Sequence, residues 1–428
     1  MNRLAGKKIA FLGYGLENQA LLTWLKKQKL ATTYTILDPH PAPAKLPTKV
    51  TWQSGQNYLK NLNSFDVVFR SPGAPLFLPE IKEAAKKGVS ITSAMNLFLE
   101  LAPTKNIIGV TGSKGKGTTA SLIAAILKAD GRKVFLGGNI GVAPFSFFEK
   151  LTAASWIVLE LSSFQLEDFR SSPRYSLLTN LFKEHLEPAD PNNPNYHKSF
   201  ASYVEAKLNI ARHPENKYFW IPKKLKTKLN SKKINGQFRF FEASNYPSLL
   251  AGDFNKENVG AAFALTNYLR VPKKTIKKAV ATFQGLPHRL ELVAVKKGIA
   301  YYDNSFSTTP ESTIADLESF PGAVIILGGA DKGADFKALA KKVKSQAHFV
   351  ILLKGTASPR LKKDLLKAGL SAQKIKEAKS MAEAVFFAGA AAPTKGVVLL
   401  STACASFGLF KNYKERGDLF QKYVRAQR

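Results

Sequence analysis

The feature that most constrains the fold is the glycine-rich run GVTGSKGKGTTASLIAAIL, which extends from Gly109 to Leu127. It joins the end of an apolar strand, through a turn of glycines and lysines, to an amphipathic helix. Such turns expose backbone N–H groups that converge on phosphate oxygens, and the helix N-terminus adds positive potential. An ordinary strand-to-helix turn is the alternative, but two lysines at the mouth of the helix favour a site for ATP phosphates.

One position in this run departs from the common phosphate loop. The lysine expected at the β- and γ-phosphates is Lys116, and in most such loops a serine or threonine hydroxyl after it binds Mg²⁺. Here Gly117 follows the lysine, and either Thr118 or Thr119 can supply the hydroxyl. The residues expected to contact the nucleotide phosphates are Gly112, Ser113, Lys114, Gly115, Gly117, Thr118 and Thr119.

The charge of the chain is strongly positive, at +32 from 63 basic and 31 acidic residues. Such a charge suggests either a polyanion partner or lysine-rich helix faces in solvent. The lysine clusters at 223–233, 273–278 and 337–344 are not interleaved with aromatic residues, as a base-stacking surface would be. We therefore expect solvated helix faces, small anionic substrates and no nucleic-acid partner.

The expected cellular compartment rests on the sequence features of membrane and secreted proteins that are missing here. It has no apolar run of about 18 residues, so we expect no membrane span. Its first residues do not have the apolar core of a signal peptide, and the single cysteine, Cys404, cannot form an internal disulfide. These features predict a cytoplasmic protein.

Short apolar runs alternate with helical patterns, which is typical of parallel α/β units. Three blocks result, with a short link at 102–105 and a second boundary at the turn 285–287. The expected strands are 8–12, 34–37 and 66–69 in the first block, 106–110, 156–161 and 175–178 in the second, and 323–327, 349–353 and 396–400 in the third. The expected helices include 16–29, 200–212, 257–269 and 273–282. The chain of 428 residues is long enough for this organisation, at about 100–200 residues per domain.

Three polar residues stand where these strands end. Glu160 ends an apolar strand, where a carboxylate in a parallel sheet can bind Mg²⁺. His185 follows the next strand and can face the same loop, although a lone histidine is more often structural. Asp38 lies about 20 residues past the first glycine turn, where an acid binds ribose in nucleotide folds; a plain turn residue before Pro39 is the other interpretation.

Several motifs together resemble the Mur ligases, the ATP-dependent enzymes that add amino acids in peptidoglycan synthesis, and within them the glutamate-adding branch. The motifs follow the family order and span nearly the whole chain: GVTGSKGKGTT (109–119), GGNIG (137–141), LELSSFQLE (159–167), NLFKEHLE (180–187), EAKLNI (205–210), GLPHRLE (285–291), GGADKGADF (328–336) and LLSTACASFGLFKNYKERG (399–417).

The resemblance implies an α/β fold of three domains. These are a Rossmann-like domain over 1–103 for the UDP substrate, a central P-loop-type ATPase domain with a mainly parallel sheet over 104–285, and a Rossmann-like domain over 286–428 for the amino acid. It implies an ADP-forming ligase that joins glutamate to UDP-N-acetylmuramoyl-L-alanine through an acyl phosphate. ATP and two Mg²⁺ ions would be required, and the enzyme would act as a monomer.

The resemblance also implies roles for residues that the motifs carry. Lys116, His185 and Lys207 would be catalytic, and Thr118, Glu160, His185 and a carbamylated Lys207 would hold metal. Without the resemblance, Lys207 reads as a solvated helix lysine. Further nucleotide contacts would be Asn255, Asn258 and a phosphate-contacting Arg289. Substrate contacts would be Asp38, Ser71, Gly73, Asn139, Ser162 and Thr308, with Lys332, Ser406 and Tyr413 on the glutamate side.

The main departure from the family lies in YDNSFSTTPEST, residues 302–313. D-glutamate-adding enzymes resemble one another in an Asp-Ser-Lys run where this chain has Asn304, Ser305 and Phe306. Loss of a cation beside a dicarboxylate leaves L-glutamate open as the acceptor. A folylpolyglutamate-type ligase, a cousin that also has GKG before a hydroxyl residue, is a second alternative. A nucleic-acid-binding ATPase is the alternative from another class.

Overall fold

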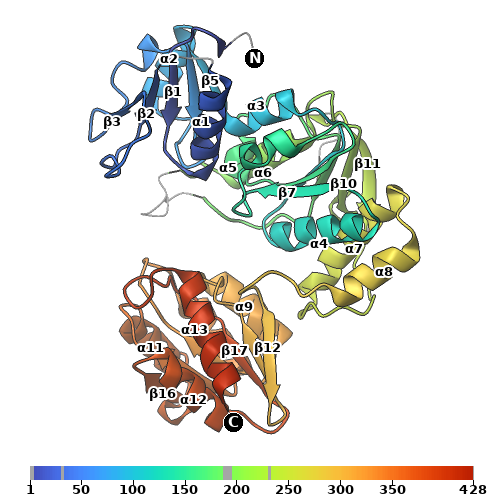
Figure 1. The fold of residues 1–428 in the computed structure, drawn as a ribbon. Helices are drawn as coiled ribbons and strands as arrows, with labels where there is room; N and C mark the ends of the chain where they lie inside the picture. Colours follow the sequence, from blue (N-terminus) through green and yellow to red (C-terminus); the bar gives the residue numbers. More distant parts are fainter. Residues whose placement is uncertain (1–3, 30–32, 187–194, 230–232, 428) are drawn as a thin grey trace. The chain divides into compact units, whose positions relative to one another are not determined.

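The computed structural model describes residues 4–29, 33–186, 195–229 and 233–427 (Figure 1). The chain divides into two compact units, Met1–Asn245 with Glu257–Ala279, and Tyr246–Lys256 with Val280–Arg428. Within the described residues the strands form three sheets, so the α/β class expected from the sequence is confirmed. In the same part of the chain, no helix combines the length and apolarity that a membrane crossing requires.

The first sheet has the strand order β3-β2-β1-β4-β5, with every neighbouring pair parallel. Because side chains alternate across a strand, Ile9 and Phe11 pack with the first helix, and Ala10 and Leu12 pack on the opposite face. The strands are β1 (Ile9–Leu12), β2 (Tyr34–Leu37), β3 (Val50–Gln53), β4 (Val67–Arg70) and β5 (Ser90–Ser93), and the helices are α1 (Leu16–Gln28), α2 (Pro79–Lys86) and α3 (Ala94–Leu101).

The second sheet, also in the first unit, has the order β11-β10-β9-β6-β8-β7 and is entirely parallel. Its strands are β6 (Ile107–Thr111), β7 (Val134–Gly138), β8 (Trp156–Glu160), β9 (Tyr175–Leu178), β10 (Tyr218–Pro222) and β11 (Gln237–Phe241), and the helices are α4 (Lys116–Ala129), α5 (Ser163–Leu166), α6 (Phe200–Leu208), α7 (Phe254–Tyr268) and α8 (Lys273–Thr282). Since β6 lies between β8 and β9, the segments that follow these three strands meet at one edge of the sheet.

The third sheet, in the second unit, has the order β12-β13-β17-β14-β15-β16. Only β12 is antiparallel to its neighbour among these strands. The strands are β12 (Glu291–Lys296), β13 (Ile299–Asp303), β14 (Val324–Leu327), β15 (Phe349–Leu353), β16 (Ile375–Ala378) and β17 (Val397–Leu400), and the helices are α9 (Pro310–Ser319), α10 (Lys337–Gln346), α11 (Ser358–Lys367), α12 (Met381–Ala391) and α13 (Tyr413–Ala426). Side chains of β14 alternate between α10 and α11 on one face and α12 and α13 on the other.

Two expectations differ from the structure in detail. The helix expected over 200–212 is α-helical only to Leu208 and continues as a 3₁₀ turn, Asn209–Ala211, where Asn209 Nδ2 donates to Leu166 O outside the helix. The lysine-rich segment 223–233 begins with a 3₁₀ turn, Lys223–Leu225, and its residues 230–232 lie outside the described residues. Glu187, the last residue of the NLFKEHLE motif, lies outside them as well.

Candidate active site

The glycine-rich loop joins β6 to α4, and the structure shows why it needs glycine at two positions. Gly112 has φ +140° and Gly115 has φ +78°, values that residues with a side chain rarely adopt. A Cβ atom on Gly112 would lie 2.0 Å from Thr179 Oγ1, and one on Gly115 would lie 2.1 Å from Asn258 Oδ1. The loop is therefore packed closely against the segments behind it.

Asn180, just after β9, holds the start of the loop. Its carbonyl accepts a hydrogen bond from Ser113 N at 3.1 Å, and its Oδ1 accepts one from Lys114 N at 2.8 Å. The Ser113 hydroxyl lies 2.7 Å from Tyr203 Oη. Since Asn180 uses these two N–H groups, those that remain for a phosphate are at the first turn of α4, where helix N–H groups have no partner in the helix.

Lysine and threonine side chains of the glycine-rich loop and of the first turn of α4 lie beside these N–H groups. Lys116 Nζ donates to Ser113 O at 2.8 Å, so the side chain folds back along the loop. The buried Thr119 hydroxyl donates to Asn258 Oδ1 at 3.1 Å, whereas Thr118 is half-buried at the start of α4. Because Thr119 already has a buried partner, Thr118 is the better-placed hydroxyl for a metal ion.

Glu160, at the end of β8, is 2% exposed. Asn139 Nδ2 donates to its Oε1 at 3.1 Å, while its Oε2 is buried and has no hydrogen-bond partner among the described residues. An unpaired buried carboxylate oxygen is costly unless a cation or donor satisfies it. Carboxylate and hydroxyl oxygens are the ligands that Mg²⁺ prefers, so Glu160 and Thr118 fit a magnesium ion.

Lys207, on α6, is 2% exposed and is not a solvated helix lysine. Its Nζ donates to Gly112 O at 2.8 Å and lies 4.5 Å from the centroid of the Tyr203 ring. Burial, followed by the charge of Lys116, holds the pKa of Lys207 well below its ordinary value, against the opposing charges of Glu184 and Glu160. A lowered pKa increases the share of the neutral amine, which is the nucleophilic form of a lysine.

His185 follows β9 with a left-handed backbone, at φ 56°. Its ring lies 5.1 Å from that of Phe164, and its carbonyl accepts a hydrogen bond from His197 N at 2.8 Å. Desolvation lowers the pKa of His185; Glu184 opposes this shift, and Lys116 and other lysines reinforce it. A neutral imidazole is the form that binds metal.

The carboxyl edge of the first sheet holds the expected UDP-side residues. Asp38 Oδ2 accepts from Tyr14 N at 3.0 Å, and its Oδ1 accepts from His40 N at 3.0 Å. Burial raises the pKa of Asp38, but these hydrogen bonds outweigh burial and lower the pKa below its ordinary value. Ser71 packs closely against the turn after β1, because a Cβ on Gly13 would lie 2.9 Å from Ser71 Cβ.

Two other substrate-side candidates have different surroundings. Among the residues that the structure describes, no atom lies within 4 Å of a Cβ built on Gly73. The Ser162 hydroxyl caps α5 by accepting from Gln165 N at 3.2 Å, and Ser162 N donates to Gln165 Oε1 at 2.7 Å. Ser162 therefore already serves as a helix cap.

A buried arginine was not singled out from the sequence. Arg70, at the end of β4, is 1% exposed; it donates to Phe164 O at 2.8 Å, and its Nε donates to Asp168 Oδ2 at 3.3 Å. Beside it, Gln165 Nε2 donates to Glu17, whose pKa burial raises to about 7. This network ties the first sheet to the segment after Glu160. Asn180, Tyr203 and His197 were likewise missed; the only signal for Asn180 was its place in the NLFKEHLE motif.

Five of the remaining candidates, Arg289, Thr308, Lys332, Ser406 and Tyr413, lie in the second unit, in segments at the carboxyl ends of its parallel strands. Tyr413 begins α13, and its ring lies 5.1 Å from that of Phe306, on which the Arg289 guanidinium stacks at 3.6 Å. Exposed Lys332 lies 5.6 Å from the Phe407 ring, next to buried Ser406. Half-buried Thr308 lies in the loop after β13, and Asn255 Nδ2 donates to Ala251 O at 2.6 Å.

Comparison with known proteins gives matches along the whole chain. Residues 7–93 match the family model "Mur ligase MurD-like, N-terminal domain", residues 110–277 match "Mur ligase middle domain", and residues 288–404 match "Mur ligase, glutamate ligase domain".

Curated relatives match over nearly their full length. The UDP-N-acetylmuramoylalanine–D-glutamate ligase of Acetivibrio thermocellus is 34% identical over 99% of this chain and 97% of its own. The enzyme of the same name from Symbiobacterium thermophilum is 33% identical over 99% of this chain and 100% of its own.

Solved structures show the same fold at low identity. The UDP-N-acetylmuramate-alanine ligase MurC of Thermotoga maritima has a TM-score of 0.57 at 18% identity, covering 98% of this chain and 100% of its own. MurF of Acinetobacter baumannii has a TM-score of 0.57 at 15% identity, covering 99% of this chain and 92% of its own.

Proposed function

Because the chain belongs to the Mur ligase family, we propose that it joins D-glutamate to UDP-N-acetylmuramoyl-L-alanine with hydrolysis of ATP to ADP and phosphate. It is an ATP-dependent amide-forming ligase of three domains. The assignment of its active site rests on the grouping of Lys116, Glu160 and Lys207 around the glycine-rich loop. Each of these three residues was expected from a separate sequence motif.

The reaction begins with two anions that must meet. The carboxylate of the UDP substrate attacks the γ-phosphorus of ATP, the bond to ADP breaks, and an acyl phosphate forms. The glutamate amine then attacks the acyl carbon, loses a proton, and expels phosphate as the amide forms. Lys116 and the N-terminus of α4 hold the phosphates and screen the approaching carboxylate.

The two proposed metal sites use polar groups that lie near the glycine-rich loop. Thr118 and Glu160 would hold one Mg²⁺, and His185 with a carbamylated Lys207 would hold a second. Bound magnesium would neutralise charge on the transferred phosphoryl group. A neutral Lys207 amine can add to CO₂ and release one proton, which gives the hard oxygen ligand that Mg²⁺ prefers.

The other contacts are proposed from the resemblance and their places in the fold. Asp38, Ser71 and Gly73 would bind the UDP substrate, with Asn139 and Ser162 nearer the reacting carboxylate. Asn255, Asn258 and Arg289 would contact the nucleotide, and Thr308, Lys332, Ser406 and Tyr413 would bind glutamate. The domain limits 1–103, 104–285 and 286–428, a cytoplasmic location and a monomeric state belong to the same proposal.

One observation favours a second acceptor, L-glutamate. Phe306 stands where the resemblance leads us to expect a lysine, and Asn304 Nδ2 donates to Asp316 Oδ2 at 2.6 Å instead of offering a carboxylate. The local chemistry of the acceptor site therefore differs from the family pattern, although the ligase reaction does not depend on it.

The test is phosphate release from ATP and Mg²⁺ with UDP-N-acetylmuramoyl-L-alanine and either D- or L-glutamate. We expect turnover with D-glutamate and none with L-glutamate. Lys116→Ala serves as the inactive control, because it removes the cation at the phosphates. Turnover with L-glutamate alone would show that L-glutamate is the acceptor. No phosphate release with either isomer would refute the proposed substrates.

A further inference from the structure

Arg70 is the last residue of β4, and its side chain is 1% exposed. It comes directly before residues 71–74, named here the substrate turn because they include two of the proposed contacts to the UDP substrate. A buried guanidinium is stable only where its charge and its N–H groups find partners. Arg70 finds them on two sides, in the substrate turn and in the segment that follows Glu160.

On the side of the first sheet, Arg70 holds the substrate turn. Its Nη1 donates to Ala74 O at 2.8 Å and to Pro72 O at 3.5 Å. The same Pro72 carbonyl accepts from Asn195 Nδ2 at 2.7 Å, and Asn195 lies in the segment before α6 of the second sheet. The backbone of the substrate turn is therefore held by side chains from both sheets.

On the side of the second sheet, Arg70 holds the segment 164–168, which begins in α5. Its Nη2 donates to Phe164 O at 2.8 Å, its Nε donates to Asp168 Oδ2 at 3.3 Å, and its Nη1 lies 3.6 Å from Glu167 Oε2. The planar guanidinium fixes these nitrogens relative to one another, whereas a lysine has all its donors on one nitrogen. One rigid group thus joins the substrate turn to this segment.

Two further hydrogen bonds support the same junction. The Gln165 side chain donates to Glu17 in the first turn of α1, while its Oε1 accepts from Ser162 N at 2.7 Å. Asn96 Nδ2, on α3, donates to Asp168 O at 2.8 Å. Since each bond joins a helix of the first sheet to the segment after β8, loss of a single contact should shift the junction and not open it.

The segment 164–168 also packs against the proposed metal ligand His185. The Phe164 ring lies 5.1 Å from the His185 ring and is stacked on the His197 ring at 4.9 Å, with 3° between the planes. The backbone N–H of His197 donates to His185 O at 2.8 Å. Arg70 therefore holds the substrate turn directly and, through Phe164, the segment that lies beside His185.

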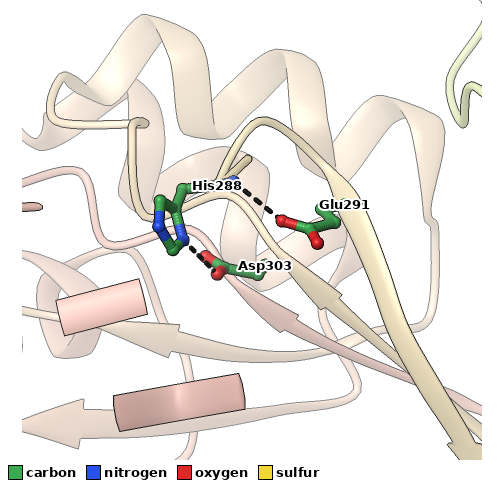
Figure 2. A group of neighbouring side chains, drawn as sticks. All are labelled: His288, Glu291 and Asp303. Atoms are coloured by element: carbon green, nitrogen blue, oxygen red, sulfur yellow. Dashed lines mark hydrogen bonds and ion pairs between the residues drawn. The ribbon is translucent and has the colours of Figure 1, made fainter. Parts of the chain in front are cut away.

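By contrast, a buried charged cluster in the second unit joins elements of a single sheet. Figure 2 shows the His288 ring directed at Asp303, with Nδ1 2.7 Å from Oδ2, and the His288 N–H directed at Glu291 Oε2 at 3.0 Å. Gln421 Nε2, on α13, donates to both carboxylates, at 2.9 Å to Glu291 and 3.0 Å to Asp303. This cluster braces β12, β13 and α13 against one another, whereas the contacts of Arg70 cross from one sheet to another.

The proposed reaction depends on how accurately two sheets are placed. In the proposed function, the first sheet holds the UDP end of the substrate and the second sheet holds the phosphates of ATP. The acyl carboxylate must then approach the γ-phosphorus to about 3–3.5 Å, and a misplacement of about 1 Å can cost about 10²-fold in rate. A junction of fixed geometry between the two sheets meets this requirement.

We propose that Arg70 is a positioning residue of the ligase reaction: it fixes the substrate turn relative to the segment 164–168 and so aligns the acyl carboxylate of the UDP substrate with the γ-phosphate of ATP. The inference rests on the proposed function, because it assumes that this carboxylate attacks ATP. Arg70 is buried and bonded within the protein, so it acts through the two segments. It should therefore govern the rate of acyl phosphate formation and not the affinity for a substrate.

The main test variant is Arg70→Lys, which keeps a positive charge beside Asp168 and Glu167 but loses the planar fork. We expect its kcat for phosphate release to fall about 10- to 100-fold, the effect of a misplaced reactant. The KM values of the UDP substrate, ATP and glutamate should change little. In single turnovers without glutamate, the burst of ADP that accompanies acyl phosphate formation should slow by the same factor.

Arg132→Lys is the matched control. Arg132 also donates to a backbone carbonyl and to a carboxylate, from Nη2 to Leu269 O at 2.9 Å and from Nε to Asp130 Oδ2 at 2.9 Å. Its partners follow α4 and α7, which both belong to the second sheet, so this arginine does not link two sheets through these bonds. The control should keep the wild-type kcat, and melts of both variants separate a loss of stability from a loss of rate.

Glu17→Ala provides a second test that does not depend on the folding of Arg70→Lys. It removes the hydrogen bond from Gln165 at the same junction and leaves no buried cation without a partner. We expect kcat to fall about fivefold, the effect of losing one hydrogen bond, again with a slower ADP burst and little change in the KM values.

The outcomes separate the inference from the proposed function. A wild type that releases no phosphate with either glutamate isomer refutes the function, and this inference with it. With an active wild type, a folded Arg70→Lys variant refutes the inference alone if it keeps the wild-type kcat, keeps the wild-type ADP burst, or recovers its rate at saturating UDP substrate. If Arg70→Lys does not fold, an unchanged kcat in Glu17→Ala refutes the inference, and the expected fall supports it.

Discussion

Replacing Gly115 by alanine tests whether the packing behind the phosphate loop sets its conformation. The residue has φ +78°, and its new Cβ would lie 2.1 Å from Asn258 Oδ1, far inside van der Waals contact. Asn258 is 3% exposed and its Oδ1 accepts the hydrogen bond of Thr119, so a shift of its amide disturbs a buried hydrogen bond. The methyl group must displace either this amide or the loop.

The magnitude follows from two contributions. A left-handed backbone costs a residue with a Cβ about 1–2 kcal/mol. Displacing Asn258 leaves the buried Thr119 hydroxyl unsatisfied, which costs about 1–3 kcal/mol more. Gly131 distinguishes the two contributions, because it has the same φ of +78° and, within the described part of the chain, no atom lies within 4 Å of its added Cβ. Gly131→Ala should therefore lose only the first contribution.

The assay is unfolding by denaturant, and by heat with and without Mg·ATP, together with the KM of ATP. We expect Gly115→Ala to be less stable than Gly131→Ala by about 1–3 kcal/mol, or about 2–12 °C in Tm. Only Gly115→Ala should also raise the KM of ATP, because only this residue lies in the loop. Equal stability and equal ATP affinity in the two variants would refute the reasoning.

Three other predictions follow from the site. Thr118→Ala should lower Mg·ATP use about tenfold or more, whereas Thr119→Ala should mainly lose about 1 kcal/mol of stability in a melt; an unchanged rate for Thr118→Ala would assign the metal to Thr119. Lys207→Ala should abolish phosphate release and regain part of it with a short carboxylic acid, and full activity without the acid would contradict the carbamate. Burial raises the pKa of Glu17 to about 7 in the folded state, so the folded state binds a proton that the unfolded state has already lost, and the stability should fall as the pH rises from about 4.5 to 7. Glu17→Gln should flatten this dependence of stability on pH in a series of melts. An unchanged dependence in the variant would exclude Glu17 as its source.

Much of the fold was predictable because its central strands are buried on both faces. The expected strands 34–37, 175–178 and 349–353 coincide with β2, β9 and β15. The missed strands include β3, β11, β12 and β16, each partly exposed and each at the edge of its sheet. The strands β10 and β13 were missed as well, although they lie inside their sheets. An edge strand needs no continuous apolar run, so its sequence resembles that of a loop.

The sequence by itself determined the residues that lie at strand ends: the phosphate loop, Glu160 and Asp38 are placed there by parallel topology alone. Only the tertiary structure decided which polar groups are buried. Lys207 donates to Gly112, 95 residues away, and Arg70 donates to Phe164, 94 residues away, and neither pairing leaves a local pattern. The lowered pKa of Lys207 and the stacking of Arg289 on Phe306 also depend on tertiary contacts that leave no local pattern in the sequence. Burial and charge at such a group depend on which distant segments surround it, and this is settled only when the sheets and helices pack.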